Sequence, residues 1–389
     1  MRKISANYIF PIHAKPIKNG MITLNDEGKI TELSTCSETD KDVEFYDGII
    51  CPGFVNAHCH LELSHLKNAI PEHTGITGFI REISKQRNIV DAQQQIQTAA
   101  FYDNLMYLHG IVAVGDISND VLTFELKKQS KIFYHTFAEA FSCNENETDK
   151  ILKKNQDIVD YGKKLGISIS PTLHASYSMC NGLFSKIKHR AEQSGILSYH
   201  NQETQAENEY FQNNSGKFLE FYNEFQTPDR PVHTGKTSIH RLLDNISKNV
   251  KILLVHNTFT SENDYDFAVS ASQNITWTLC PKSNLYIENC LPPIEMFRRK
   301  NARIAIGTDS LSSNTSLSII NELFTISENF DNIELNELLT WATLNGAKAL
   351  GIEAKFGTFE HGKTPGIVLI DNVDTDKMML TQDSRSQTL

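Results

Sequence analysis

Short apolar segments recur along the chain, and each is followed by a polar stretch that is compatible with a helix. Segments such as GIVAVGDIS at 110–118 and ARIAIGTDS at 302–310 are nearly continuous in small and branched apolar residues. This composition is typical of parallel strands that are buried on both faces. The pattern predicts eight strands, within Gly48–Leu61, Gly110–Ser118, Lys131–Phe141, Gly166–Ser176, Ile196–Gln202, Val250–Thr258, Asn274–Pro281 and Arg303–Ser310.

The stretches between these segments have the spacing of amphipathic helices. Asp149–Leu165 places its apolar residues on one side, and Glu334–Leu350 ends before Gly351, a residue that often terminates a helix. Alternating strands and helices imply a parallel sheet. Eight such units predict an α/β fold of the (β/α)₈ TIM-barrel type. A doubly wound open sheet is the alternative, although it usually contains fewer units.

The two ends of the chain differ from its middle. Short alternating strands separated by turns are predicted near the N-terminus, in MITLNDEGKITEL at 21–33, and again in GTFEHGKTPGIVLI at 357–370. We expect residues 1–47 and 355–380 to form a small β-sandwich domain beside a barrel of residues 48–354. The polar tail at 381–389 is expected to be frayed.

Composition narrows the classes of function. The net charge of −10 disfavours binding to nucleic acid, and no stretch of 18 apolar residues predicts a membrane span. Seven Cys without a CxxC pair, and an N-terminus without an apolar signal segment, predict a cytoplasmic protein with reduced thiols. We expect a small-molecule substrate as the partner, and a homo-oligomer is compatible with the sequence. Neither GxGxxG nor a P-loop is present.

Metal-binding residue types follow several of the predicted strands, where barrel enzymes place their chemistry. His58 and His60 are two positions apart on the first predicted strand, so both side chains face the same side. His200, His256 and Asp309 stand at the ends of the fifth, sixth and eighth strands. An isolated HxH pair is weak evidence, but four strand ends with His or Asp predict a metal site, and imidazole with carboxylate suits zinc or iron.

The segments PGFVNAHCHLELS, YHNQET, LLVHN and IAIGTDSLSSN together resemble the amidohydrolase superfamily, most closely its branch of nucleoside and heterocycle deaminases. The resemblance implies that one divalent metal ion, zinc or iron, is bound by His58, His60, His200 and Asp309. It also implies that Glu203 shuttles a proton, that His256 is catalytic and that Asp309 accepts the proton of the water. Glu203 taken alone is also compatible with a helix N-terminal acid. One ion is expected because the fourth strand, ISISPTLHAS, lacks the lysine that bridges two ions in many members.

The substrate is less constrained than the reaction. HCHLELS is similar to the corresponding segment of bacterial aminodeoxyfutalosine deaminases of menaquinone synthesis, which implies that Glu62 contacts the purine or the ribose. His174 and Ser178, after the fourth strand, are predicted to contact ribose hydroxyls, although Ser178 is also an ordinary loop residue. Aminodeoxyfutalosine also bears a carboxylate, and Arg81 and Arg87 are candidate partners for it. An exposed arginine on a helix, however, is usually only solvated.

Other functions stay open at this stage. Within the branch they are deamination of S-adenosylhomocysteine, methylthioadenosine or guanine, and chlorohydrolysis of triazines. An amide-ring hydrolase of the hydantoin kind is disfavoured by the missing lysine. A metal-free structural relative is disfavoured because all four metal positions are intact. Zinc deaminases with the combined HxE…PCxxC signature are excluded, because the chain contains no PCxxC.

Overall fold

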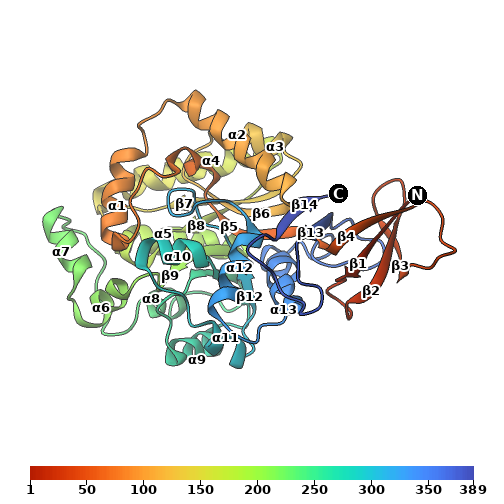
Figure 1. The fold of residues 1–389 in the computed structure, drawn as a ribbon. Coiled ribbons are helices and arrows are strands. Elements are labelled where there is room, and N and C mark those ends of the chain that lie inside the picture. The colour runs from red at the N-terminus through yellow and green to blue at the C-terminus, as the bar shows by residue number, and fades with distance from the viewer.

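Eight parallel strands form the centre of the molecule in a computed structural model that describes residues 1–389. They form two four-stranded sheets with the orders β5-β6-β7-β8 and β12-β11-β10-β9 (Figure 1). The strands are β5 (Phe54–Cys59), β6 (Ile111–Ser118), β7 (Phe133–Ala140), β8 (Ser168–Leu173), β9 (Ile196–Asn201), β10 (Lys251–His256), β11 (Ile275–Leu279) and β12 (Ile304–Ile306). Each lies within one of the eight predicted segments.

The two sheets meet at both of their edges. Single-residue parallel bridges join Cys59 to Asp309 and Ala175 to His200. At the first junction the carbonyl of His58 accepts the Asp309 amide at 3.1 Å, and at the second the carbonyl of His174 accepts the His200 amide at 2.9 Å. The strand order is therefore circular, as in the predicted TIM barrel. Both junctions lie at the carboxyl ends of the strands, so the closure itself brings candidate site residues together.

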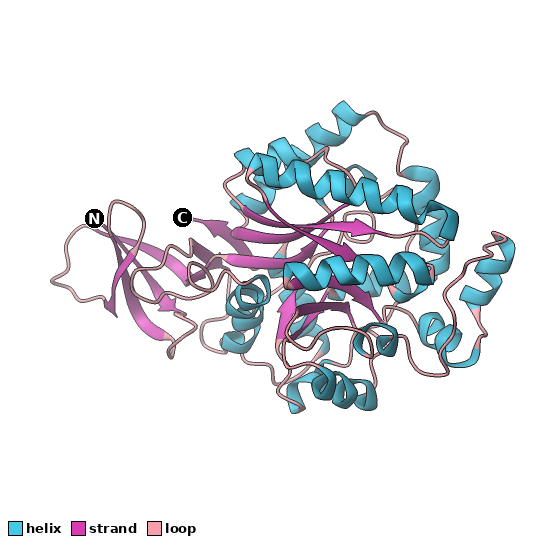
Figure 2. Cartoon of the chain, turned by 180° about the vertical axis from the view of Figure 1, so that it is seen from behind, coloured by secondary structure: helices cyan, strands magenta, loops and turns pink.

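Helices surround the strands (Figures 1 and 2). The outer helices are α2 (Ala92–Leu108), α3 (Phe124–Gln129), α4 (Thr148–Leu165), α5 (Asn181–Ser194), α9 (Glu262–Ala271), α11 (Ile294–Arg299), α12 (Ile319–Asn329), α13 (Leu335–Thr340) and α14 (Gly346–Leu350). The helix predicted at 149–165 is confirmed as α4. The one predicted at 334–350 is α13 and α14 with a π-helical turn at Trp341–Asn345 between them, and it ends at Gly351, which has φ 71°.

Five further helices follow the carboxyl ends of barrel strands. They are α1 (Gly75–Gln86), α6 (Gln205–Asn213), α7 (Lys217–Glu224), α8 (Ile239–Leu243) and α10 (Pro281–Glu288). Of these, α1, α6 and α7 lie at the end of the barrel that is opposite the small sheet (Figure 1). The chain contains no helix with the length and hydropathy needed to cross a membrane.

Both termini contribute to one six-stranded sheet of order β14-β13-β4-β1-β2-β3. Its strands are β1 (Arg2–Ile9), β2 (Ile17–Leu24), β3 (Ile30–Thr35), β4 (Val43–Pro52), β13 (Ile367–Asp371) and β14 (Arg385–Thr388). The expected sandwich is thus a single sheet, because the C-terminal strands extend the N-terminal sheet at its edge instead of stacking on it. The tail is not frayed, since β14 pairs with β13 and the Ser386 hydroxyl donates to His109. β4 also continues to Pro52, past the boundary predicted at residue 47.

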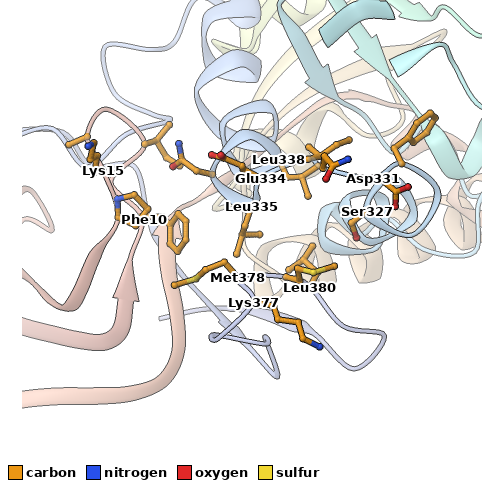
Figure 3. Close-up of a pocket in the computed structure, with 18 of the residues that line it drawn as sticks. Phe10, Lys15, Ser327, Asp331, Glu334, Leu335, Leu338, Lys377, Met378 and Leu380 are labelled. Carbon is orange, nitrogen blue, oxygen red and sulfur yellow. The ribbon is translucent and has the colours of Figure 1, made fainter. Parts of the chain in front are cut away.

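A large groove of about 1240 Å³ lies between the small sheet and the barrel (Figure 3). Phe10 and Lys15 line it from one side, Glu334 and Leu335 from the start of α13 and the residue before it, and Met378 from the C-terminal segment. Its acidic side chains, such as Glu334, are exposed, and no cluster of metal-type ligands lines it. The candidate chemistry lies elsewhere, at the carboxyl ends of the barrel strands.

A buried ion pair supports the loop that leaves β5. Lys127 Nζ lies 2.5 Å from Asp116 Oδ2, and neither side chain is exposed to solvent. The second oxygen of Asp116 accepts the Leu61 amide at 2.8 Å, directly after His60. Because an unpaired buried charge is costly, this pair holds the backbone next to the two histidines in one position.

Candidate active site

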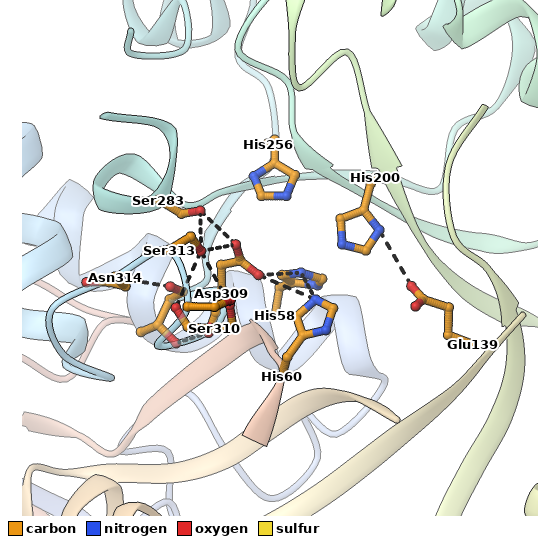
Figure 4. Close-up of polar contacts among 12 residues, drawn as sticks. His58, His60, Glu139, His200, His256, Ser283, Asp309, Ser310, Ser313 and Asn314 are labelled. Carbon is orange, nitrogen blue, oxygen red and sulfur yellow. Dashed lines mark hydrogen bonds and ion pairs between the residues drawn. The ribbon is translucent and has the colours of Figure 1, made fainter. Parts of the chain in front are cut away.

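Four histidines and one aspartate converge at the carboxyl ends of β5, β9, β10 and β12 (Figure 4). All five side chains, those of His58, His60, His200, His256 and Asp309, are buried. The Nε2 atoms of His58 and His60 lie 3.1 Å apart, and Asp309 Oδ1 lies 3.6 Å and 3.4 Å from them. The ligand atoms of His58, His60 and His200 lie within 4.8 Å of one another, as do those of His58, His256 and Asp309.

The hydrogen bonds orient His200. Its Nδ1 lies 3.1 Å from the carbonyl oxygen of His174, which can only accept a hydrogen bond. Nδ1 therefore carries the proton, and Nε2 is left as a free acceptor. Burial also lowers the pKa of both His60 and His200 well below the usual value, which keeps their rings neutral. Neutral imidazole is the form that binds a metal ion.

Asp309 presents one oxygen to the histidines. Its Oδ2 accepts the hydroxyls of Ser283 at 2.7 Å and Ser313 at 2.6 Å, so Oδ1 faces His58 and His60. Burial acts to raise the pKa of Asp309, but the hydrogen bond with His58 and the other histidines hold it well below the usual range. A carboxylate oxygen and several neutral imidazole nitrogens in one buried cluster fit a divalent cation of the zinc type.

His256 and Glu203 form a second pair beside this cluster. Asn284 Nδ2 donates to His256 Nδ1 at 3.2 Å, which places the imidazole proton on Nε2, and Nε2 lies 3.6 Å from Glu203 Oε1. The Tyr177 hydroxyl donates to the other Glu203 oxygen at 3.1 Å. Burial raises the pKa of Glu203 well above its usual value, and the negative charge of Asp309 adds to this effect. Glu203 can therefore carry a proton near neutral pH, as an acid catalyst must.

The backbone at this site is strained. Gln202, His256 and Asp309 have φ of 45°, 73° and 56°, in the left-handed region that non-glycine residues rarely adopt. Such conformations persist where the surrounding structure enforces them, and they are concentrated at functional sites. His256 is the last residue of β10, and Gln202 and Asp309 follow β9 and β12, so the strained residues all lie at the carboxyl ends of barrel strands.

These side chains open into one cavity of about 190 Å³. Its polar wall includes His60, His200, Glu203, His256 and Asp309. Its lining also includes Ile76, Phe79, Ile80 and Ile83, which follow the i, i+3, i+4, i+7 spacing of one face of α1. The cavity therefore combines reactive polar groups with an apolar helix face.

The structure brings only some of the predicted substrate-binding residues to the cavity. His174 and Ser178 line it, with His174 Nδ1 2.7 Å from the Ser178 hydroxyl, and Arg87 lines it too. Glu62 does not line it, because this carboxylate is buried behind Arg87, to which it is bonded, and accepts the Asn119 amide at 2.9 Å. This geometry places Glu62 next to the cavity-lining Arg87 and not in the cavity, and its contact with the substrate stays a prediction.

Arg81 is also placed outside the cavity. Its guanidinium pairs with Glu224 of α7 and lies 5.2 Å from the centre of the Phe221 ring. The helical spacing explains the difference, because Arg81 follows the cavity-lining Ile80 by one residue and so faces another side of α1.

Glu139 and Asn119 line the cavity as well, and the sequence analysis did not single them out. Glu139 is the last but one residue of β7, and Asn119 directly follows β6. Both could have been found by the rule that identified Asp309, because each is a polar residue at the carboxyl end of a barrel strand.

The chain matches the Amidohydrolase family over residues 49–387. It is 28% identical over 322 residues to a protein of Helicobacter pylori named adenosine deaminase, covering 79% of this chain and 76% of that protein. It is 28% identical over 337 residues to the aminodeoxyfutalosine deaminase of a Nitratiruptor species, covering 84% and 79%.

A solved structure has the same fold. It is the aminofutalosine deaminase of Helicobacter pylori in complex with methylthio-coformycin, with a TM-score of 0.82 and 22% identity over 95% of this chain and 92% of that one. With the family match over most of the chain, these likenesses agree with the geometry of the site. The chain belongs to the amidohydrolase family and is a hydrolase of C–N bonds.

Proposed function

We propose that this hydrolase deaminates adenosine-like nucleosides with the help of one divalent cation, and that aminodeoxyfutalosine is its preferred substrate. The observation that carries the proposal is the position of Glu203, a protonatable acid, in the same cavity as the His and Asp cluster. Deamination of a purine needs both a nucleophilic water and a proton donor to the ring nitrogen. The names of the relatives from Helicobacter pylori and Nitratiruptor support the nucleoside class.

His58, His60, His200 and Asp309 would hold the cation, which is zinc or iron on the chemistry of the donors. When bound, such an ion lowers the pKa of a coordinated water and so makes a nucleophile available near pH 7. We expect one ion. A third group, formed by Glu139, His174 and His200, does not make a second site, because His200 Nδ1 is already committed to a carbonyl.

The remaining groups position the water and move protons. Asp309 accepts the proton that the attacking water gives up, since its low pKa keeps it ionised and two serine hydroxyls hold its other oxygen. His256 directs its Nε2 proton toward the reacting centre and holds the water by a hydrogen bond. Glu203 protonates the ring nitrogen next to the attacked carbon, and Tyr177 keeps its carboxyl group in place.

The apolar wall favours a substituent on the ribose. From Ile76 to Ile83 the face of α1 extends for about 10 Å, at a rise of 1.5 Å per residue. Phe79, Ile80 and Ile83 are only half-buried, so their apolar surface faces the cavity. The aryl ketone of aminodeoxyfutalosine would cover this surface. The methylthio group of methylthioadenosine would cover less of it, and we keep this compound as the second candidate.

The proposal is tested by release of ammonia from a panel of substrates in the presence of zinc or ferrous iron. The panel contains aminodeoxyfutalosine, methylthioadenosine, S-adenosylhomocysteine, adenosine and guanine. We expect kcat/KM to be highest for aminodeoxyfutalosine, because only this compound offers both an aryl group and a carboxylate. A tenfold preference for guanine would refute the choice of substrate, and no release of ammonia from any compound would refute deamination.

Arg87 is expected to determine the preference for the carboxylate. It is the only Lys or Arg that lines the cavity, and its contacts with Glu62 and Asn119 use only Nη2, which leaves further donors free. We predict that Arg87→Gln lowers kcat/KM for aminodeoxyfutalosine by about 10- to 100-fold, the effect of losing a hydrogen bond to a charged group. The value for adenosine should change by less than about threefold.

Arg81→Gln is the matched control for this prediction, because Arg81 lies on the same segment but outside the cavity. It should leave both substrates within about twofold of the unmodified enzyme, as surface substitutions usually do. An equal loss for aminodeoxyfutalosine and adenosine in Arg87→Gln would show that Arg87 only supports the fold of the cavity wall.

A further inference from the structure

Glu139 presents a carboxylate oxygen that no group in the protein satisfies. The residue is 6% exposed and lines the cavity. Its Oε2 accepts Asn119 Nδ2 at 2.9 Å, whereas the buried Oε1 has no hydrogen-bond partner. His200 Nδ1 lies 3.7 Å from Oε1, but its proton is directed to the carbonyl of His174. An unpaired buried carboxylate oxygen is costly, so its retention calls for a ligand that donates a hydrogen bond.

His174 lies near this carboxylate and offers a complementary group. Its Nδ1 is engaged by the Ser178 hydroxyl at 2.7 Å, which leaves the second ring nitrogen free. A carboxylate oxygen of Glu139 and a ring nitrogen of His174 lie within 4.8 Å of each other. Two atoms closer than about 5.6 Å can both reach one oxygen at the usual hydrogen-bond distance of about 2.8 Å. One hydroxyl, or two adjacent hydroxyls, can therefore bind to both residues.

The position of this pair relative to the catalytic groups identifies which part of the substrate it meets. Glu139 lies on the far side of His200 from Asp309 (Figure 4). The purine must lie against Glu203 and His256, where the proton is delivered. A group that extends from the purine past His200 toward Glu139 is the sugar, and its hydrogen-bond donors are the 2′ and 3′ hydroxyls.

We propose that Glu139, together with His174, binds the ribose hydroxyls and makes the enzyme select ribonucleosides over deoxyribonucleosides. The inference rests on the proposed nucleoside deaminase function. Glu139 accepts a hydrogen bond from the sugar through Oε1, and Asn119 fixes the carboxylate by holding Oε2. The selectivity follows because a deoxynucleoside leaves the buried oxygen without a donor, an arrangement that enzymes reject strongly.

The test compares adenosine, 2′-deoxyadenosine and 3′-deoxyadenosine as substrates of the unmodified enzyme and of Glu139→Gln. We expect the unmodified enzyme to prefer adenosine over at least one deoxy analogue by about 30-fold or more in kcat/KM, as for a hydrogen bond to a charged group. Glu139→Gln should reduce this preference to less than about fivefold, mainly by loss of activity on adenosine. Glu147→Gln is the control, since Glu147 follows β7 but does not line the cavity.

Three results would overturn the inference. The first is an unmodified enzyme that deaminates all three nucleosides equally well. The second is an equal loss on all three in Glu139→Gln together with a reduced zinc content, which would assign Glu139 to the support of His200. The third is a second equivalent of zinc in the unmodified enzyme that is lost in Glu139→Gln. This result would assign Glu139 to a metal site instead of the sugar.

A binding measurement separates this inference from the proposed function. Calorimetric titration with inosine, 2′-deoxyinosine and 3′-deoxyinosine needs no turnover. If no nucleoside releases ammonia but inosine still binds more tightly than a deoxy analogue, and Glu139→Gln removes that difference, the proposed deamination fails while the ribose site stands. If ammonia is released but inosine and both deoxy analogues bind alike, the ribose site fails and the deaminase stands.

Discussion

Replacing His200 by alanine is expected to abolish both metal retention and turnover. The unmodified protein should retain about one equivalent of zinc or iron per chain, as expected for a single site with His and Asp ligands. Only His200 supplies this cluster from the β9 side, and its free Nε2 is oriented by the hydrogen bond from Nδ1 to the carbonyl of His174. With three ligands left on the β5 and β12 side, the ion is open to solvent and to chelators.

Metal analysis after dialysis against a chelator measures retention, and release of ammonia measures turnover. His189→Ala is the control, because His189 is exposed on α5, and it should keep both properties. Circular dichroism should show that the His200→Ala variant is folded, since the barrel core does not depend on this side chain. Full metal occupancy in His200→Ala, or two equivalents in the unmodified protein, would contradict the proposed single site.

The barrel could be predicted from the sequence because its strands are buried on both faces. Segments such as those of β6 and β12 then read as almost uninterrupted apolar runs, which helices and exposed strands rarely show. The small sheet was predicted less well. Its strands pair between residues more than 300 positions apart, as β4 does with β13, and no local pattern specifies whether such strands stack or extend one sheet.

The convergence of the His and Asp residues could be predicted for a related reason. His58, His200, His256 and Asp309 lie on or directly after strands, so the closure of the barrel alone brings them together. No comparable rule places the residues of loops and of short helices, whose conformation depends on tertiary packing. Arg81 illustrates this, since one position along α1 separates a residue that lines the cavity from one that pairs with Glu224.

Glu62 does not line the cavity, although its motif was recognised. Glu62 follows His60 by two positions, so its backbone lies close to the site. Its side chain can still point either into the cavity or behind it. Here the turn at Leu61–Leu66 directs it to Arg87 and to the Asn119 amide, and burial raises the pKa of Glu62 to about 7. Its role in this structure is to hold Arg87 at the cavity wall.

Glu203→Gln is expected to lower kcat by about 10² to 10⁴ while metal content and stability are preserved. Glutamine has the size of glutamate and can still bond to the Tyr177 hydroxyl, but it has no proton to transfer at neutral pH. The pKa of Glu203 is raised by burial and by the charge of Asp309, so in the unmodified protein this group can give its proton to a substrate. The loss should fall on kcat more than on KM, because the transfer occurs in the chemical step.

Glu207→Gln is the control that isolates this role. Glu207 is equally buried, its pKa is raised to about 7, and it lies one helical turn further along, but it does not line the cavity. If burial of an acid near the site were all that mattered, the two variants would behave alike. We expect Glu207→Gln to lose less than about tenfold in kcat, within the range of structural effects. A Glu203→Gln variant with near-native kcat and full metal content would assign the proton transfer to another residue.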